Sequence, residues 1–328
     1  MTLLRRSLLA FAAGLAATPL VAHAQASAWP TKPVTVVVPF AAGGSVDSAA
    51  RLVLQKVGER LKQTFIVDNT PGAAGTIGTY KAAKAQADGY TLLFAVSSPI
   101  TVAPVVKPST VKYDAMKELV PVGVVATSPF VLVAGPKTPA STTAELVDLA
   151  KKQPGKLNYG TDGVGTSMHL TAELIKLKAG IDVLHVPYKS GPQVLTEVSS
   201  GLLDLAVMPV VLVQPFIKDG KVKAIGVTSA ERWPSLPDVP PLQATPALRG
   251  LAIDSWYGLF APAGTDPAIV ARLGRETAEA LKDPELVKRM ADAGLKATSL
   301  DAGAFAALIR KERDEMASVV KAAGIQPE

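Results

Sequence analysis

The sequence predicts an α/β protein built from two units, each a parallel sheet covered by helices. Short apolar strands alternate with helical segments in two separate series, and two further apolar stretches connect the series. The chain has 328 residues, enough for two domains of roughly 100–200 residues each. A single large doubly wound domain is the alternative that periodicity leaves open.

The first unit has three strand segments separated by helices. Residues 34–38 are almost continuously β-branched, which is typical of a buried strand. Apolar residues then recur at helical spacing as far as Leu61. A strand at 65–67, a helix at 76–86 and a strand at 90–96 complete the series. This order predicts parallel strands connected by helices.

A long charge-free stretch, 119–136, leads to the second unit. It contains Pro121 and Pro129, so two consecutive strands are expected in place of one. In the second unit we expect helices at 142–152, 167–178 and 192–200, and strands at 156–159, 183–186, 203–208 and 222–228.

The chain then returns towards the first unit. A low-charge strand is expected at 255–262, followed by helices at 267–282, 284–293 and 301–323. Two crossings divide the chain into one lobe at 27–125 plus 253–328 and another at 126–252, with a cleft between them. Two α/β lobes joined by two strands are the architecture of bilobed solute-binding proteins, which close by hinge motion.

The N-terminus has the three regions of a secretory signal. Arg5 and Arg6 precede an uncharged apolar segment, and small residues follow at 22–26. The apolar segment is short for a membrane span, so residues 1–26 are interpreted as a signal peptide cleaved after Ala24 or Ala26. The mature protein is therefore expected in the periplasm.

The composition argues against several classes of protein. Cysteine is absent and there are only three histidines, which removes disulfides, thiolate metal sites and cysteine nucleophiles. Aromatic residues are 5% of the chain, too few to suggest a stacking surface for nucleic acid. His169 is interpreted as a packing or capping residue, and His185 as a buried, hydrogen-bonded residue of an apolar strand. We predict no catalytic residue, no metal, no cofactor and no nucleic-acid partner.

Two glycine-rich loops, 39–45 and 163–167, each separate a predicted strand from a predicted helix. Glycines allow backbone N–H groups to approach a ligand closely, and a helix N-terminus has unpaired donors and a partial positive charge. Alone, each loop is more typical of a tight turn. One such loop in each unit, at the same topological position, favours an anion held between them. The third glycine of a dinucleotide fingerprint is missing, because Met168 follows Gly165 at that spacing.

Eight motifs along the mature chain resemble, in order, the Bug-type extracytoplasmic receptors, the substrate-binding proteins of tripartite tricarboxylate transporters. They are Trp29–Val34, Val38–Asp47, Val67–Gly75, Leu157–Gly160, Gly163–Leu170, Val186–Gly191, Leu236–Pro240 and Trp256–Pro262. The resemblance implies a type II periplasmic-binding-protein fold with a small carboxylate held between the lobes. It also implies delivery of that ligand to membrane permease subunits driven by an ion gradient.

The resemblance also implies a set of ligand-binding residues. They are Phe40, Ala42, Gly43, Gly44, Ser45 and Asp47 in the first loop, Thr161, Gly163, Gly165, Thr166 and Ser167 in the second loop, and Ser97 and Ser98 on the floor between the loops. Asp47 is also expected to interact with the first-turn N–H groups of its own helix.

The sequence departs from the family pattern at two places. Ala41 and Ala42 replace the usual prolines, which predicts a less rigid first loop. Asp162 stands where a small neutral residue is usual. The favoured interpretation is that its carboxylate points outward; contact with a ligand ammonium group is the alternative.

The main hypothesis is a monomeric periplasmic receptor for a small carboxylate. A sensor that binds the same ligand for a signalling partner, and an exported enzyme acting on a carboxylate, are the alternatives. The sequence leaves a dicarboxylate, an aromatic acid, an amino acid or a nicotinate-like acid open as ligand, because backbone donors bind each carboxylate alike.

Overall fold

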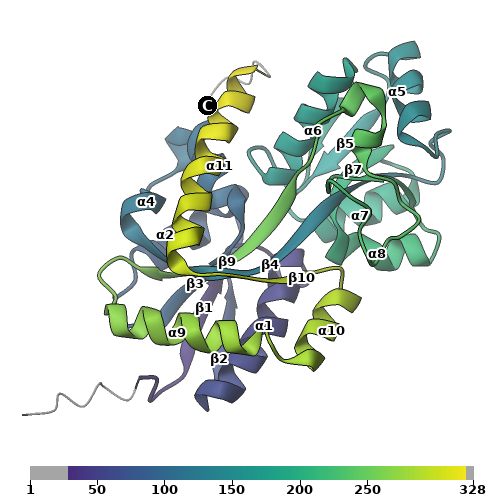
Figure 1. Cartoon of the computed structure of the whole chain (residues 1–328). Coiled ribbons are helices and arrows are strands. Elements are labelled where there is room, and N and C mark those ends of the chain that lie inside the picture. The colour runs from purple at the N-terminus through teal and green to yellow at the C-terminus, as the bar shows by residue number, and fades with distance from the viewer. Residues whose placement is uncertain (1–28, 323–328) are drawn as a thin grey trace, which may run out of the picture.

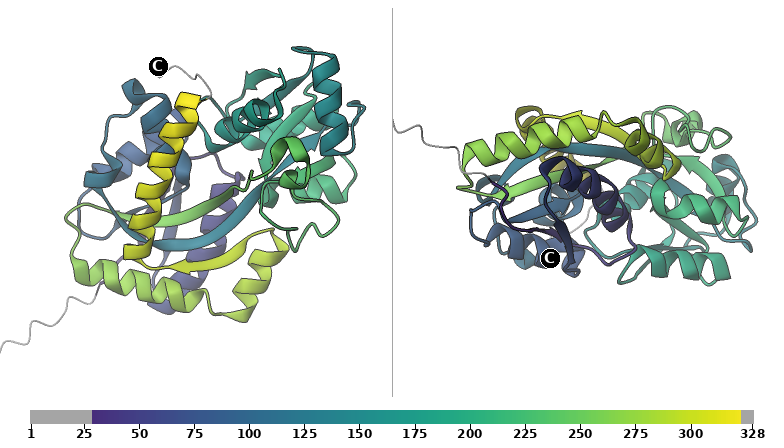
Figure 2. Two further views of the ribbon diagram at one scale, coloured as in Figure 1. Left: turned by 45° about the horizontal axis from the view of Figure 1, so that its top comes forward. Right: turned by 90° about the horizontal axis from the view of Figure 1, so that it is seen from below.

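The computed structural model describes residues 29–322 (Figure 1), so the predicted signal peptide lies outside the described residues. Its strands pair in the order β2-β1-β3-β9-β4-β7-β5-β6, with β8 and β10 also paired to β4. Two groups of helices lie around the two ends of this arrangement, and β4 and β9 run side by side between them (Figures 1 and 2). The α/β fold class with two crossing strands is thus confirmed.

The first part of the chain forms parallel strands joined by helices. Its elements are β1 (Val34–Val38), α1 (Ser45–Leu61), β2 (Phe65–Asn69), α2 (Thr76–Ala83) and β3 (Thr91–Ala95), followed by the short α3 (Ala103–Val106) and α4 (Ala115–Glu118). Strand β1 pairs in parallel with both β2 and β3. Its four valines are buried, and Thr35 is half-buried.

The expectation of two strands at 119–136 is wrong, because one strand, β4 (Leu119–Ala134), covers the stretch. Its first part pairs with β9 (Asp254–Pro262), and its last residues, from Phe130, pair with β7 and β8. Both prolines lie where the ladder changes: the register shifts after Pro121, and the pairing with β9 ends at Pro129. Proline lacks a donor N–H, so these are positions where a strand tolerates it.

The second part repeats the alternation. Its elements are α5 (Thr143–Lys152), β5 (Asn158–Thr161), α6 (Ser167–Ala179), β6 (Leu184–Pro187), α7 (Gly191–Ser200), β7 (Leu205–Pro209), α8 (Val210–Lys218) and β8 (Lys223–Val227). After β9 the chain forms α9 (Pro267–Ala280), α10 (Pro284–Asp292), β10 (Lys296–Leu300) and α11 (Ala302–Ala322). Short turns of helix are η1 (Ala73–Gly75), η2 (Ser98–Val102), η3 (Pro108–Thr110), η4 (Leu242–Ala244) and η5 (Pro246–Leu248).

Apolar side chains gather in separate cores. The buried residues of one cluster all lie within 130–251. Those of two others come from 29–126 and 256–309. A small fourth cluster joins Val102, Val106 and Val320 to Leu170 of α6, so α3 and α11 pack against the second part of the chain. The two parts therefore have their own cores and also touch each other.

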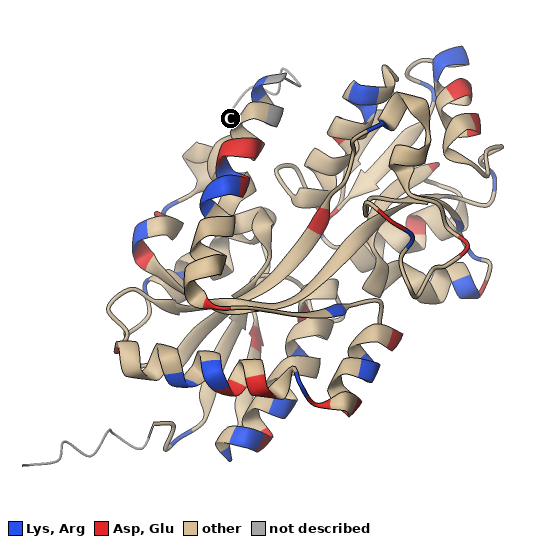
Figure 3. Cartoon of the chain, in the orientation of Figure 1, with Lys and Arg blue, Asp and Glu red and all other residues tan. Residues whose placement is uncertain are grey.

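Charged residues lie mainly on the helices, while the strands contain few of them (Figure 3). Positively and negatively charged residues both occur along α9, α10 and α11. Within residues 29–322, no helix combines the length and apolar character needed to cross a membrane.

Candidate functional site

A cavity of about 670 Å³ lies between the loops that follow several strands. The loop after β1 and the start of α1 contribute Phe40, Gly44 and Ser45 to its wall. The loop after β5 and the start of α6 contribute Gly163 and Ser167. The cavity has the size of a small-molecule site and lies at the carboxyl ends of parallel strands, where ligands bind in α/β sheets.

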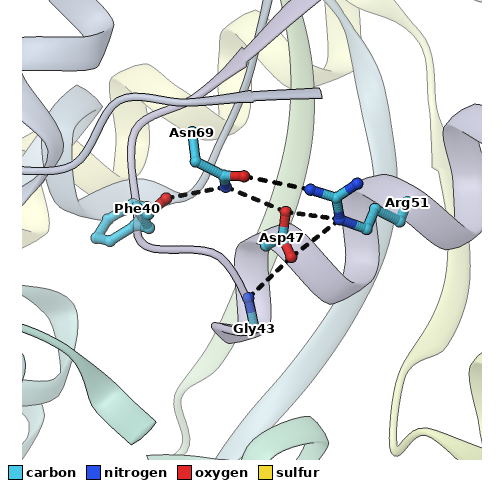
Figure 4. A network of polar contacts seen from close by, with 5 residues as sticks. All are labelled: Phe40, Gly43, Asp47, Arg51 and Asn69. Atoms are coloured by element: carbon cyan, nitrogen blue, oxygen red, sulfur yellow. Dashed lines mark hydrogen bonds and ion pairs between the residues drawn. The ribbon is translucent and has the colours of Figure 1, made fainter. Parts of the chain in front are cut away.

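The first loop is held from behind by the carboxylate of Asp47, which is almost fully buried on α1 (Figure 4). Asp47 Oδ2 accepts the Gly43 N–H at 2.9 Å, Oδ1 accepts Asn69 Nδ2 at 3.1 Å, and both oxygens lie near Arg51 Nε. Asn69 Nδ2 also donates to the Phe40 carbonyl. Asp47 thus fixes both ends of the loop, through Gly43 itself and through Asn69, in place of the first-turn contact expected from the sequence.

These contacts also determine the charge of Asp47. Burial alone would raise its pKa, but hydrogen bonds from Arg51, Gly43 and Asn69 outweigh burial and hold the pKa below its ordinary value. Asp47 is therefore ionised at neutral pH, and its role in the described structure is to shape the loop.

Replacing Asp47 by alanine is expected to lower the free energy of unfolding by about 1–2 kcal/mol, because the Gly43 N–H loses its acceptor and Asn69 loses one of its two. Asp47→Asn keeps one amide oxygen as an acceptor but loses the ion pair with Arg51, so it should lose less. Chemical denaturation of the three proteins measures the difference. Equal stability of Asp47→Ala and wild type would show that the loop holds its shape without this carboxylate.

Three serines connect the two parts of the chain at the cavity. Ser167 Oγ lies 2.7 Å from Ser97 Oγ and 3.0 Å from Ser98 Oγ. The Ser167 N–H, at the start of α6, donates to Ser98 Oγ at 2.9 Å. Ser98 and Ser167 line the cavity, whereas Ser97 does not. The floor between the loops is thus a direct polar contact across the interface.

The second loop is supported by a histidine pair. His169 and His185 stack with ring centroids 4.4 Å apart. His169 Nδ1 accepts the Gly165 N–H at 3.3 Å, and His185 Nε2 lies 2.7 Å from Thr161 Oγ1. Burial and the neighbouring His169 lower the pKa of His185 to about 4. Both rings therefore act as packing and hydrogen-bonding supports, which agrees with their interpretation from the sequence.

Hydroxyl groups give the same loop its shape. Thr166 Oγ1 caps α6 by accepting the His169 N–H, and it donates to the Gly163 carbonyl at 2.9 Å. Thr161 Oγ1 also contacts the Gly163 backbone. Gly163 itself has φ of 131°, a conformation that residues with a β-carbon rarely adopt.

The Asp162 side chain does not have the orientation expected from the sequence. The preference for an outward carboxylate is wrong, because Asp162 lines the cavity and its Oδ1 atom is buried. Burial raises the pKa of this carboxyl to about 6, although a hydrogen bond from Thr166 opposes the shift. Asp162 follows directly after the end of β5, and the loop then turns at Gly163.

The structure brings together part of the residue set that the sequence predicted. The cavity wall includes Phe40, Gly44, Ser45, Ser98, Gly163 and Ser167. It does not include Ala42, Gly43, Asp47, Ser97, Thr161, Gly165 and Thr166. Most of this second group makes hydrogen bonds that shape the two loops or join them to each other.

Two further loops of the wall were not nominated from the sequence. Residues 71–75 follow β2, and residues 188–192 follow β6. The rule that ligands bind at the carboxyl ends of strands, applied to all parallel strands, would have found both. In the first of them Ala73 and Ala74 have φ of 48° and 55°, a left-handed backbone that is strained for alanine. Phe130, Ser255 and Tyr257 of the crossing strands also reach the cavity.

Two α/β parts joined by crossing strands, with a cavity between their loops, define the class of bilobed solute-binding proteins. The model of the tripartite tricarboxylate transporter family receptor matches residues 49–325, so this chain belongs to that family. Within residues 29–322 there is no group of three His, Asp or Glu side chains placed to hold a metal ion.

Individual relatives agree with the family assignment. The protein BugT of Bordetella pertussis is 33% identical over 313 residues, covering 94% of this chain and 95% of BugT. The structure of Rpa4515 from Rhodopseudomonas palustris with adipate has a TM-score of 0.88 and 31% identity, covering 92% of this chain and all of that one. MatC from the same organism, with bound malate, has a TM-score of 0.83 and 30% identity, covering 89% and 99% of the two chains.

Proposed function

We propose that this protein is a periplasmic receptor that captures a small carboxylate in the cavity and delivers it to the membrane subunits of a tripartite transporter. One observation carries the proposal: α1 and α6, from the two parts of the chain, both begin at residues of the cavity wall, Ser45 and Ser167. Helix N-termini offer unpaired N–H donors and favour negative charge. The adipate and malate held by two relatives support the same ligand class.

The proposed ligand contacts are those cavity residues that offer donors or a close backbone approach. They are Gly44, Ser45, Ser98, Gly163 and Ser167, with Phe40 as an apolar wall. The residues behind them, Asp47 and Thr166 in particular, position the loops. No catalytic role is assigned to any of these side chains.

Capture requires an opening between the two parts. We take 27–125 plus 253–328 as one lobe and 126–252 as the other, with β4 and β9 as the connections about which a monomer opens and closes. The separate apolar cores on the two sides support rigid lobes. The signal-like residues 1–26 support export to the periplasm.

Isothermal titration with a panel of mono- and dicarboxylates tests the proposal. We expect a dissociation constant in the micromolar range or below for at least one member, which corresponds to about 8 kcal/mol. Several charge-assisted hydrogen bonds of roughly 1.5–3 kcal/mol each can supply it after association costs. Absence of binding at millimolar concentration across the panel would contradict a carboxylate receptor, and turnover of a bound acid would indicate an enzyme.

A further inference from the structure

Asp162 places a carboxylate in the wall of a cavity that otherwise suits an anion. Its Oδ1 atom is shielded from solvent, and no hydrogen-bonding partner for it is found among residues 29–322. The residue lies beside Gly163 on the loop that opens α6. A buried carboxylate oxygen without a hydrogen-bond donor is unfavourable. We therefore expect the ligand to bring a donor group to this carboxylate.

The charges of the wall have both signs. Lys107 and Lys189 line the same cavity as Asp162. No ion pair joins Lys189 to Asp162 within the described chain, although other acidic side chains do form such pairs. A ligand with only negative charge would meet the lysines and the helix ends favourably and would meet Asp162 unfavourably. A ligand with charges of both signs satisfies the whole wall.

We propose that the ligand is a carboxylate that also carries an ammonium group, and that Asp162 accepts a hydrogen bond from this group. The inference rests on the proposed function and narrows its ligand class. The carboxylate of the ligand takes the first-turn N–H donors of α1 and a serine hydroxyl at the start of α6. The ammonium group donates to the Asp162 carboxylate in a charge-assisted contact. Asp162 is thereby a specificity-determining residue.

The test uses sets of three acids that differ at a single carbon, which carries hydrogen, hydroxyl or ammonium. Succinate, malate and aspartate form one set, glutarate, 2-hydroxyglutarate and glutamate a second, and 3-phenylpropionate, 3-phenyllactate and phenylalanine a third. In at least one set, the ammonium acid should bind wild type at least 10-fold more tightly than both other acids. In Asp162→Asn, that ratio should fall to within about threefold, while the unsubstituted acid binds no more weakly than before.

A matched control removes the same charge elsewhere. Asp148 is exposed on α5 of the same lobe, so Asp148→Asn should keep the wild-type preference. The preference should also shrink in wild type between pH 7.5 and pH 5.5, because protonation of Asp162 removes its charge while the ligand amine stays charged. Lys107, Lys189, His169 and His185 remain in Asp162→Asn, so a pH dependence caused by them would persist there.

The outcomes separate this inference from the function on which it rests. Tight binding of an unsubstituted or hydroxyl acid, with no ammonium preference in any set, overturns the role of Asp162 and leaves a carboxylate receptor standing. An ammonium preference that survives Asp162→Asn assigns the contact to another residue and also overturns it. Failure of every acid to bind at millimolar concentration would contradict the proposed carboxylate-receptor function, and with it the role of Asp162.

Discussion

Valine in place of Gly44 is expected to weaken carboxylate binding at least 100-fold. Gly44 is the N-cap residue of α1 and lines the cavity. Because it has no side chain, it leaves the start of the helix open to the cavity. A branched side chain at this position would cover the first-turn N–H groups of α1. Loss of two charge-assisted hydrogen bonds at roughly 1.5–3 kcal/mol each gives about 3–6 kcal/mol, which exceeds a 100-fold change.

The same substitution should leave the fold nearly intact. Gly44 has φ of −75°, which any residue adopts, so no backbone strain is added. A Cβ would lie 3.0 Å from the Ala41 carbonyl oxygen, so this turn must move by a few tenths of an ångström to accept it. Circular dichroism and thermal unfolding should therefore resemble those of wild type, while titration with the best ligand of the panel shows the loss.

Gly43→Ala is the matched control, one residue earlier in the loop. Gly43 has φ of 75° and does not line the cavity. Alanine there costs about 1–2 kcal/mol of stability, because an L-residue is strained in this conformation. Its effect on affinity should be much smaller than that of Gly44→Val. The reverse order, with Gly44→Val binding normally, would place the ligand away from the start of α1.

Local sequence patterns were sufficient for most of the fold. The run Val34–Val38 and the helical spacing that ends at Leu61 each define an element by themselves, and both appear as expected. Two elements that the sequence analysis did not predict, α8 and β10, lack such a pattern. Helix α8 reads Val-Val-Leu-Val at its start and contains Pro215, so it resembles a strand in sequence. Strand β10 is short and half exposed, and it exists because it pairs with β4.

The residues of the candidate site also differ in whether a local sequence pattern predicts them. The loops at 39–45 and 163–167 were predicted because glycine marks them and their place after a strand follows from topology. The orientation of the Asp162 side chain was not predicted, because it depends on how neighbouring residues pack around that side chain. Tyr257 was not predicted as a cavity residue for a related reason. It belongs to an apolar strand, and it reaches the cavity because β9 crosses between the two parts of the chain. Contacts between distant segments are what the sequence pattern leaves undetermined.

Glu312→Gln is expected to stabilise the protein at pH 8 by up to about 3 kcal/mol. Glu312 lies on α11. Its Oε2 atom accepts hydrogen bonds from Thr101 Oγ1 at 3.0 Å and from Trp256 Nε1 at 2.8 Å. Burial raises the pKa of this carboxyl to about 7, against the opposing effect of both hydrogen bonds. Glutamine keeps an oxygen that can accept from both donors and carries no charge at any pH.

The direction of the pH effect follows from the raised pKa. Because the folded protein binds this proton more tightly than the unfolded chain, the contribution of Glu312 to stability is full below pH 4.5 and is lost as pH rises through about 7. The advantage of Glu312→Gln over wild type should therefore be largest at pH 8 and should fall to about 1 kcal/mol or less at pH 5. Chemical denaturation at these two pH values measures it, with Asp314→Asn, an exposed acid on the same helix, as control. An advantage of equal size at both pH values would show that Glu312 does not change its charge in this range.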